Sequence, residues 1–296
     1  MTHVIDGNAV AESVRDDVRA AIDELEADDV TPGLATVLMG GDDGSATYVA
    51  MKQRACEEVG IDGTTVEIDP EEPPEALYEV IDDLNDDPAI HGILVQMPVP
   101  DHVPKREVLS RVDPLKDVDG FHPENVGRMV SGHPRFKPCT PHGIQKLLAS
   151  ADVDPEGMDA VVLGRSEIVG KPMANLLMQK AAGGNATVTV CHSRTQDLAE
   201  KTRAADLVVA AVGRPEMLTG DMLSEGTVVI DVGTNRVDAD NEKGYELTGD
   251  VDFESAREKA SVISPSPGGV GPMTITMLLY NTVKAASLQS GVDVGL

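Results

Sequence analysis

The sequence has few cysteines, few basic residues and no long apolar run, and each shortage excludes a class of protein. Cys56, Cys139 and Cys191 lie far apart and form no C-x-x-C pair, which argues against a disulfide scaffold or a zinc site. No segment approaches the roughly 18 uncharged apolar residues of a membrane span, and residues 1–17 contain no apolar core of signal-peptide length. We therefore expect no bound metal, no membrane partner and a reducing, cytoplasmic location.

Basic residues are scarce, because 24 Lys and Arg stand against 51 Asp and Glu, for a formal net charge of −27. Such a surface is a poor partner for nucleic acid. An acidic chain either binds cationic partners, usually through a concentrated tail, or is solvated in a very salty cytoplasm. Here the acidic residues are spread over the whole length, with short runs at 27–29, 69–75 and 82–87. This favours a salt-adapted organism, since salt screens the self-repulsion of such a surface.

The first part of the chain alternates between helical and strand patterns. A length of 296 residues is sufficient for two domains, although one large domain is the alternative. We predict helices over 8–27, 45–60 and 74–87, and strands over 34–40, 64–68 and 90–98. This alternation indicates a parallel α/β architecture.

Residues 112–141 interrupt the alternation. They are rich in Pro, Gly and polar residues and lack periodicity, so we predict a long functional loop or linker. A second α/β series follows, with helices predicted over 142–150, 171–182 and 197–205 and strands over 160–163, 186–190, 207–212 and 227–232. A final helical pattern within 271–288 places six residues on one face: Ile275, Leu278, Leu279, Thr282, Val283 and Ala286.

The stretch DAVVLGRSEIVGKP, residues 159–172, has the outline of a phosphate-binding turn between a strand and a helix. Its spacing, Gly164, Ser166 and Gly170, differs from G-x-G-x-x-G because the middle glycine is replaced. Gly164 permits a sharp turn and lets a phosphate approach the backbone. An ordinary strand–helix turn has the same outline, so this stretch alone leaves both interpretations open.

The next predicted strand favours NADP over NAD. NAD-specific sites place a carboxylate near the end of this strand, but here none precedes Asp197. In its place stand His192, Ser193 and Arg194, and Arg165 lies in the first turn. Hydroxyl and guanidinium groups suit a 2′-phosphate, which a carboxylate would repel. The alternative is that Arg194 is merely solvated.

Three further turns follow apolar segments. The turns AAVGRP at 210–215 and IDVGTN at 230–235 each end a strand, and carboxyl ends of strands are where α/β sheets bind ligands. We therefore predict that Gly213 and Thr234 line the cofactor site, although both turns have ordinary structural explanations. Residues 264–274, SPSPGGVGPMT, offer consecutive backbone N–H groups, either for a ligand or for the start of a helix.

The first part of the chain carries a second group of polar residues. Tyr48 and Lys52 are four residues apart, so they share a helix face. Gln96 ends an apolar strand, and Asp117 and Asp119 stand in the irregular segment. Each of these residues alone has an ordinary explanation as a surface or turn residue.

Ten segments together closely resemble one family, the bifunctional methylenetetrahydrofolate dehydrogenase/methenyltetrahydrofolate cyclohydrolases. In the family's order they are YVAMK, GILVQMPVP, KDVDGFHPENVG, PCTP, GRSEIVGKP, VTVCHSRT, AAVGRP, VIDVGTN, GDVDF and SPSPGGVGPMT. No single segment is decisive, but ten in register over nearly the whole chain are highly specific.

The resemblance implies two α/β domains that face each other across a cleft. Residues 1–139 would form a folate-binding catalytic domain and residues 140–271 a Rossmann-type NADP-binding domain. Helix 272–296 would return to the first domain, and the protein would be a homodimer. The implied activity is oxidation of 5,10-methylenetetrahydrofolate by NADP⁺ and hydrolysis of the product to 10-formyltetrahydrofolate, in one-carbon metabolism and purine biosynthesis.

The resemblance also implies roles for individual residues. Lys52 matches the catalytic lysine, and Gln96 matches the glutamine that hydrogen-bonds it. Tyr48 matches the tyrosine that packs on the folate, and Asp119 matches the aspartate that holds the pterin ring.

The glycine-rich segment and the cofactor turns complete the implied site. Substrate binding is assigned additionally to Pro267, Gly268 and Gly269, and cofactor binding to Gly164, Arg165, Ser166, Ser193, Arg194, Gly213 and Thr234. Three positions depart from the family pattern: Thr234 replaces a common isoleucine, Ser266 a frequent valine and Arg54 a frequent lysine. The first change could alter packing beside the nicotinamide.

Other functions compete with this interpretation. A monofunctional dehydrogenase of the same fold, or a relative of amino-acid or shikimate dehydrogenases, would use a related cleft. A non-catalytic NADP-responsive binding protein would tolerate the loss of Lys52 and Gln96. The combination of Tyr48, Lys52, Gln96 and Asp119 favours the folate enzyme.

Overall fold

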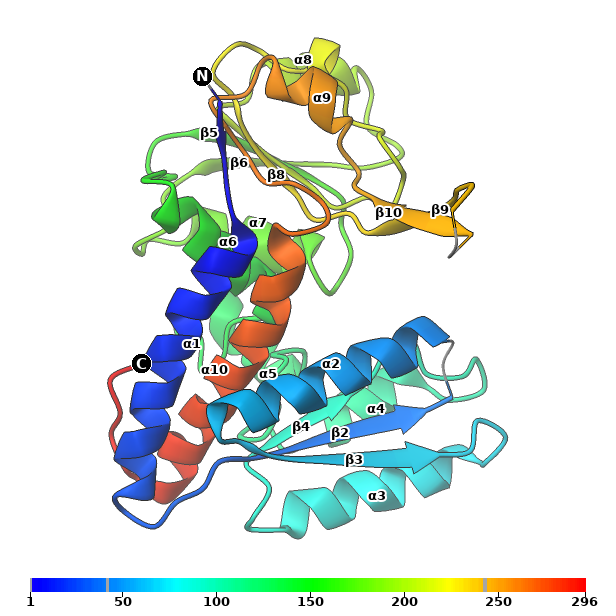
Figure 1. Cartoon of the computed structure of the whole chain (residues 1–296), viewed down its shortest axis with the longest axis vertical. Helices are drawn as coiled ribbons and strands as arrows, with labels where there is room; N and C mark the ends of the chain where they lie inside the picture. Colours follow the sequence, from blue (N-terminus) through cyan, green and yellow to red (C-terminus); the bar gives the residue numbers. More distant parts are fainter. Residues whose placement is uncertain (1, 41–42, 242–243) are drawn as a thin grey trace. The chain divides into compact units, whose positions relative to one another are not determined.

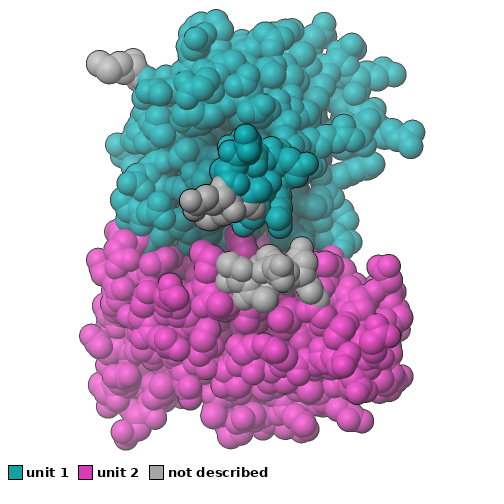
Figure 2. Space-filling view, turned by 45° about the vertical axis from the view of Figure 1, so that its right-hand side comes forward, with its two compact units in different colours: residues 1–11, 140–274 teal, residues 12–139, 275–296 magenta. Residues whose placement is uncertain are grey.

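The chain forms two compact units, which Figure 2 shows in different colours. The computed structural model describes residues 2–40, 43–241 and 244–296, without the side chains of residues 43–47. Unit 1 comprises residues 1–11 and 140–274, and unit 2 comprises residues 12–139 and 275–296. Within the described ranges, no helix is long and apolar enough to cross a membrane.

The first residues of the chain belong to unit 1, whereas the predicted boundary groups them with the N-terminal domain. Strand β1, His3–Val4, pairs in parallel with β11, Val262–Ile263. A hydrogen bond of 2.9 Å from Ile5 N to Ile263 O extends this pairing. A two-residue strand is too short to produce a periodic pattern, so neither strand was anticipated.

Unit 2 contains a three-stranded parallel sheet in the order β3-β2-β4. Its strands are β2 (Gly33–Met39), β3 (Asp62–Ile68) and β4 (Gly92–Val95), and its helices include α2 (Asp43–Val59), α3 (Pro74–Asp86) and α4 (Lys105–Arg111). The central strand and β4 are apolar along most of their length because both faces of the sheet are covered (Figure 1). Leu77 and Ile81 of α3 are fully buried against one face of this sheet.

Two long helices complete unit 2. Helix α1 spans Gly7–Glu26 and α10 spans Val270–Ser290, and their parts in unit 2 run side by side (Figure 1). Arg15 Nε donates a 3.1 Å hydrogen bond from α1 to Thr276 Oγ1 of α10. The six residues predicted to share one face of α10 are all buried.

The prediction of a long functional loop or linker over 112–141 is wrong in part. Helix α5, Pro123–Val130, forms within it, and α6, Cys139–Ser150, begins before the segment ends. His122 caps α5 by accepting a hydrogen bond from Glu124 N, and Pro123 occupies the first turn, where its missing N–H costs nothing. Its two buried residues are Asn125 and Met129, and a single buried apolar residue gives no period to detect.

Unit 1 contains a six-stranded parallel sheet in the order β1-β11-β8-β7-β5-β6. The remaining elements of this unit are β5 (Asp159–Leu163), α7 (Gly170–Met178), β6 (Thr187–Cys191), α8 (Leu198–Arg203), β7 (Leu207–Ala210), η1 (Gly220–Met222), β8 (Val228–Asp231) and α9 (Phe253–Arg257). The chain passes from β5 outward to β6 and then returns to β7 on the other side of β5. The strand order therefore reverses at β5 and β7, where open α/β sheets bind ligands.

A β-hairpin, β9 (Asn235–Asp238) with β10 (Tyr245–Thr248), projects from unit 1 (Figure 1). It follows directly after the turn that ends β8. Arg236 lies over the ring of Tyr245, 3.8 Å from its centroid. The hairpin was not anticipated, because its strands are short and mostly polar.

Candidate active site

A buried lysine forms the centre of the polar group in unit 2. Lys52 lies on α2 and is only 8% exposed, and its Nζ donates a 2.8 Å hydrogen bond to Gln96 Oε1. Gln96 follows the carboxyl end of β4 and donates from Nε2 to Met97 O, at 2.8 Å. Both hydrogen-bonding ends of the amide are therefore used, and its oxygen is held toward the lysine.

Tyr48 lies one turn before Lys52 on α2. The Nζ of Lys52 is 5.8 Å from the centroid of the Tyr48 ring, within the range of a cation–π contact. The ring is 37% exposed, so an apolar surface is open to a ligand beside the buried lysine.

Asp119 is the carboxylate whose charge acts most strongly on this lysine. Burial lowers the pKa of Lys52, and the carboxylate of Asp119 partly opposes that shift. Burial likewise raises the pKa of Asp119, and the charge of Lys52 opposes that change. Burial thus favours the neutral form of each group, and their mutual attraction favours the charged pair.

The loop that carries Asp119 is held by the buried carboxylate of Asp117. This carboxylate accepts hydrogen bonds from Phe121 N at 3.1 Å, His122 N at 2.8 Å and Asn125 Nδ2 at 2.8 Å. Burial raises the pKa of Asp117 to about 7 even with these donors present. Of the two aspartates in KDVDGF, Asp117 therefore orders the loop, whereas the charge of Asp119 acts on Lys52.

Two supporting residues were missed by sequence reasoning. Lys116 Nζ donates to the carbonyls at the end of α3, namely Leu84 O, Asn85 O and Asp87 O. Asn281 of α10 donates from Nδ2 to Val118 O at 2.7 Å and to Lys137 O at 3.0 Å. An amide on an otherwise apolar helix was the available signal for Asn281.

The turn after β5 in unit 1 depends on two glycines. Gly164 has φ +117°, and a Cβ there would lie 2.1 Å from Ala211 O in the turn after β7. A Cβ on Gly170 would lie 2.4 Å from Gly164 O. Ser166 Oγ accepts hydrogen bonds from Val169 N at 3.1 Å and Gly170 N at 3.2 Å, so it holds the backbone at the point where α7 begins. Both glycines are needed for this close backbone approach.

The turn after β6 presents polar side chains to solvent. His192 N donates to Thr195 Oγ1 at 2.8 Å, and Arg194 N donates to His192 Nδ1 at 3.2 Å. These local bonds leave Ser193 and Arg194 exposed. Arg165 is also exposed, and it follows the neighbouring strand β5. Because the two strands are parallel, these side chains start from the same edge of the sheet.

The turns after β7 and β8 lie at the same edge. Gly213 has φ +65° and open space where a side chain would be, and its N–H donates to Asp250 Oδ2 at 3.0 Å. Thr234 is exposed, and Asn235 after it donates to Asp250 Oδ1 at 2.9 Å. The residues of all four turns therefore fit a dinucleotide laid along the carboxyl ends of β5–β8.

The glycine-rich segment before α10 also belongs to unit 1. The bond between Ser266 and Pro267 is cis, and Gly268 has φ +98°. Gly268 O accepts a 3.0 Å hydrogen bond from Gly7 N, and a Cβ on Gly269 would lie 2.4 Å from Pro265 O. The segment is thus a tightly folded connection that leads into α10.

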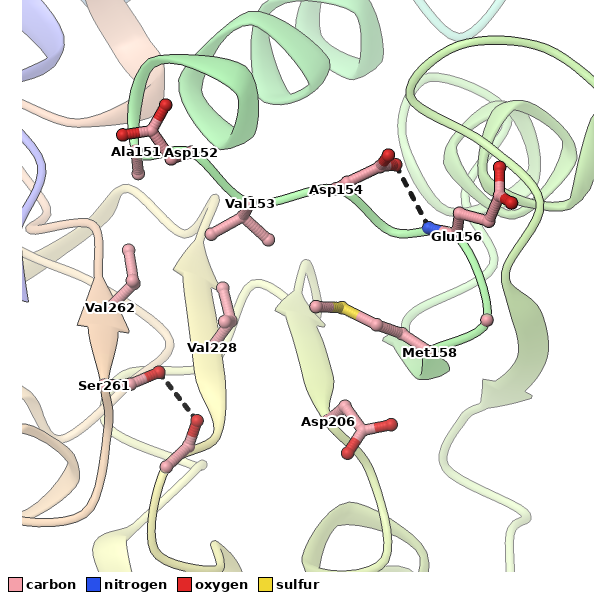
Figure 3. Close-up of a pocket in the computed structure, with 12 residues that line it drawn as sticks. Ala151, Asp152, Val153, Asp154, Glu156, Met158, Asp206, Val228, Ser261 and Val262 are labelled. Atoms are coloured by element: carbon pink, nitrogen blue, oxygen red, sulfur yellow. Dashed lines mark hydrogen bonds between the residues drawn. The ribbon is translucent and has the colours of Figure 1, made fainter.

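A pocket at the opposite, amino-terminal edge of the same sheet contains none of the predicted site residues (Figure 3). Its lining includes Asp152, Asp154, Glu156 and Asp206. Asp154 accepts a hydrogen bond from Glu156 N at 3.2 Å, as in an ordinary turn. The acidic lining is unsuited to a phosphorylated ligand.

The parallel sheet with its glycine turn defines a dinucleotide-binding α/β enzyme, with a buried lysine in the second unit. Comparison with known proteins identifies the enzyme family. Residues 5–119 match the family model "Tetrahydrofolate dehydrogenase/cyclohydrolase, catalytic domain", and residues 138–290 match its "NAD(P)-binding domain". The chain belongs to the tetrahydrofolate dehydrogenase/cyclohydrolase family, as the ten segments predict.

Relatives and solved structures match along the whole chain. "Bifunctional protein FolD 2" of the halophilic archaeon Haloarcula marismortui is 70% identical over 100% of both chains. The crystal structure of the bifunctional FolD enzyme of Campylobacter jejuni is 45% identical, with TM-score 0.92, over 97% of this chain and 99% of that one. The FolD structure of Trypanosoma brucei, complexed with NADP and an inhibitor, is 40% identical, with TM-score 0.92, over 98% of each chain. The halophilic relative agrees with the acidic composition.

Proposed function

We propose that this enzyme oxidises 5,10-methylenetetrahydrofolate with NADP⁺ and then hydrolyses the 5,10-methenyl product to 10-formyltetrahydrofolate, using Lys52 in the second step. The hydrogen bond from buried Lys52 to Gln96 carries the proposal, because a lysine is rarely buried without a charged or hydrogen-bonding partner. Since burial lowers its pKa, the side chain is brought toward the neutral form that can accept a proton.

The oxidation needs alignment rather than acid–base catalysis at the reacting carbon. When bound, NADP⁺ accepts a hydride from the methylene carbon, which leaves the methenyl cation on the folate. The protein's contribution is to hold the two reactants in line and to exclude water. Tyr48 would pack on the folate through its exposed ring, and Asp119 would accept paired hydrogen bonds from the amino-pyrimidinone edge of the pterin.

The hydrolysis needs a base. Water adds to the methenyl carbon, and neutral Lys52 takes a proton from the attacking water as the carbon–oxygen bond forms. The bond from this carbon to N5 then breaks: N5 gains a proton, the added hydroxyl loses its proton to become the formyl carbonyl, and 10-formyltetrahydrofolate results. A charged ammonium at Lys52 would oppose the cationic substrate, whereas a neutral amine held by Gln96 would not.

NADP specificity would come from the turns after β5 and β6. Arg165 and Arg194 would face the 2′-phosphate together with the Ser193 hydroxyl, and their exposure lets them turn toward it. The Gly164–Ser166 turn would receive the pyrophosphate, Gly213 and Thr234 would line the nicotinamide side, and residues 267–269 would contribute backbone groups to folate binding.

The proposal includes a homodimer that works in a salty cytoplasm. The high acidic charge supports the salt requirement. Light scattering in molar KCl should give twice the mass of the chain, and a monomeric mass would remove the dimer from the proposal.

The test of function is an assay in molar KCl that follows methenyltetrahydrofolate absorbance, with NADP⁺ compared with NAD⁺. Turnover that prefers NADP⁺, followed by loss of product faster than its uncatalysed hydrolysis, is the expected result. Product that decays only at the uncatalysed rate would indicate a monofunctional dehydrogenase. If a folded sample binds NADP but shows no turnover, the assignment of methylenetetrahydrofolate as the substrate is wrong.

A further inference from the structure

We propose that Asp250 is a positioning residue for the cofactor, because its buried carboxylate holds the turns after β7 and β8 in the shape that receives the dinucleotide. The inference rests on the proposed function, in which Gly213 and Thr234 line the cofactor site. It adds a residue that touches neither substrate nor cofactor and acts through the two turns.

One carboxylate holds three consecutive backbone N–H groups. Asp250 is completely buried, and its Oδ2 accepts from Val212 N at 2.6 Å and Gly213 N at 3.0 Å. Its Oδ1 accepts from Arg214 N at 2.9 Å. The turn after β7 is thus wrapped around a single anion, as backbone nests are. These N–H groups are directed inward, so the turn is better suited to the ribose and nicotinamide, which carry no negative charge, than to a phosphate.

The same carboxylate reaches the turn after the neighbouring strand. Its Oδ1 also accepts from Asn235 Nδ2 at 2.9 Å, one residue after Thr234. The two strands pair in parallel, so both turns emerge at one edge of the sheet. A change in the Asp250 carboxylate therefore acts on both turns together.

A second buried carboxylate fixes the backbone of the first. Asp231 ends β8, and its Oδ1 accepts from Asp250 N at 2.9 Å and from Gly233 N at 3.0 Å. Its Oδ2 accepts from Val251 N at 3.2 Å. Burial raises the pKa of Asp231 to about 6, and the nearby charge of Asp250 adds to that shift.

Glycines surround this carboxylate pair closely. A Cβ on Gly233 would lie 2.4 Å from Asp250 Cγ, and a Cβ on Gly249 would lie 1.7 Å from Asp231 Oδ2. Two adjacent buried carboxylates are costly even with hydrogen-bond donors. The backbone donors to Asp250 are those of the turn after β7 itself, and Asp231 in turn holds Gly233 N and the backbone of Asp250, which gives the arrangement a purpose beyond connecting two strands.

The experiment is the Asp250→Asn variant, which keeps the side-chain shape but replaces one acceptor oxygen with a donor facing N–H groups. We expect the KM for NADP⁺ to rise by about tenfold or more, because loops that bind the cofactor lose their anchor. Cyclohydrolase kcat/KM, measured on methenyltetrahydrofolate without NADP, should stay within about twofold of the parent, since Lys52 and its partners lie in unit 2.

Two controls separate positioning from charge and from stability. Asp240→Asn makes the same charge change at an exposed position in the hairpin connection, and it should leave both activities unchanged. Thr202→Val removes a buried 2.7 Å hydrogen bond to Met222 O in the same unit and should lower the melting temperature without changing the KM for NADP⁺. Should Asp250→Asn fail to fold, Asn235→Ala removes a single donor and should raise this KM by about threefold.

The inference is overturned if both activities fall in proportion, or if the KM for NADP⁺ in a folded Asp250 or Asn235 variant equals that of Thr202→Val. Failure of the proposed function would be visible separately, because the parent chain itself would then lack NADP-dependent oxidation. In that case NADPH fluorescence titration of the same variants still measures whether Asp250 orders a dinucleotide site.

Discussion

The two units form their candidate sites by different means. In unit 2 the chemistry belongs to buried side chains that hold one another, as Lys52 is held by Gln96 and the Asp119 loop by Asp117. In unit 1 the backbone determines the shape of the candidate site. Gly164 lets its turn pack closely against Ala211 O, and Asp250 anchors the turn that contains Gly213. Arg165, Ser193 and Arg194, which are predicted to distinguish NADP from NAD, are exposed.

This difference predicts how each site fails. In unit 2, removing a functional group should abolish a reaction while the fold persists, because a buried carboxylate that loses its counter-charge, such as Asp119 without Lys52, can take up a proton. In unit 1, adding a single methyl group should disrupt the fold, whereas removing an exposed arginine should change specificity only.

The largest expected effect is on unit 2. Lys52→Met should lower cyclohydrolase activity by about 10²–10⁴-fold, the usual contribution of a positioned base, while NADP binding persists. Stopped-flow hydrolysis of methenyltetrahydrofolate measures the first quantity and NADPH fluorescence titration the second. Lys180→Met, at an exposed lysine of unit 1, is the matched control. Hydrolysis at the parent rate in Lys52→Met would remove the base from the mechanism.

The second effect is on unit 1. Gly164→Ala should destabilise the protein by about 3 kcal/mol, because the new Cβ would overlap Ala211 O and the positive φ disfavours a side chain. Gly157→Ala also has a positive φ, +78° against +117° at Gly164, but it has open space around the new Cβ, so it should cost only about 1 kcal/mol. Thermal unfolding in molar KCl compares the two. Equal losses would mean that backbone conformation, rather than the close contact, governs the turn.

Much of the architecture was accessible from the sequence because it is local. Apolar runs and helical periods placed most strands and helices of both sheets, and spacing placed Tyr48 and Lys52 on one face. Elements that are short or mostly polar, such as α5 and the β9–β10 hairpin, were not predicted, and neither were contacts between distant segments. The hydrogen bonds of Asn281 to Val118 O and of Asp250 to the turn after β7 join residues more than thirty positions apart. The neighbouring residues in the sequence do not distinguish the buried Asn281 amide or Asp250 carboxylate from a solvent-exposed one.

The third effect should leave the fold unchanged. Arg194→Ala should lower the preference for NADP⁺ over NAD⁺, expressed as a ratio of kcat/KM values, by about tenfold through the loss of a charge-assisted contact. Its free energy of unfolding should change by less than about 0.5 kcal/mol, because the side chain is exposed. Arg106→Ala, on the surface of unit 2, controls for the change in net charge. An unchanged cofactor preference would leave Arg194 as a solvated residue.

The smallest expected effect is a shift in pH dependence. Cyclohydrolase kcat should rise with pH as Lys52 loses its proton, and the midpoint should lie below the ordinary lysine value because burial lowers this pKa. Burial disfavours the charged form in the folded state, so the same group should also make the fold more stable as pH rises through that range. The kcat of the hydride-transfer step should not show this rise with pH.

Tyr48→Leu tests the contact that opposes the shift. Its ring stabilises the charged ammonium from 5.8 Å, so its loss should lower the pKa of Lys52 further and move the kcat profile to lower pH by about 0.3–0.5 units. Met51→Leu, at an exposed position on the same helix, should leave the profile in place. A shift to higher pH would show that Tyr48 acts on the lysine through desolvation rather than through its π face, and would assign the depressed pKa partly to this ring.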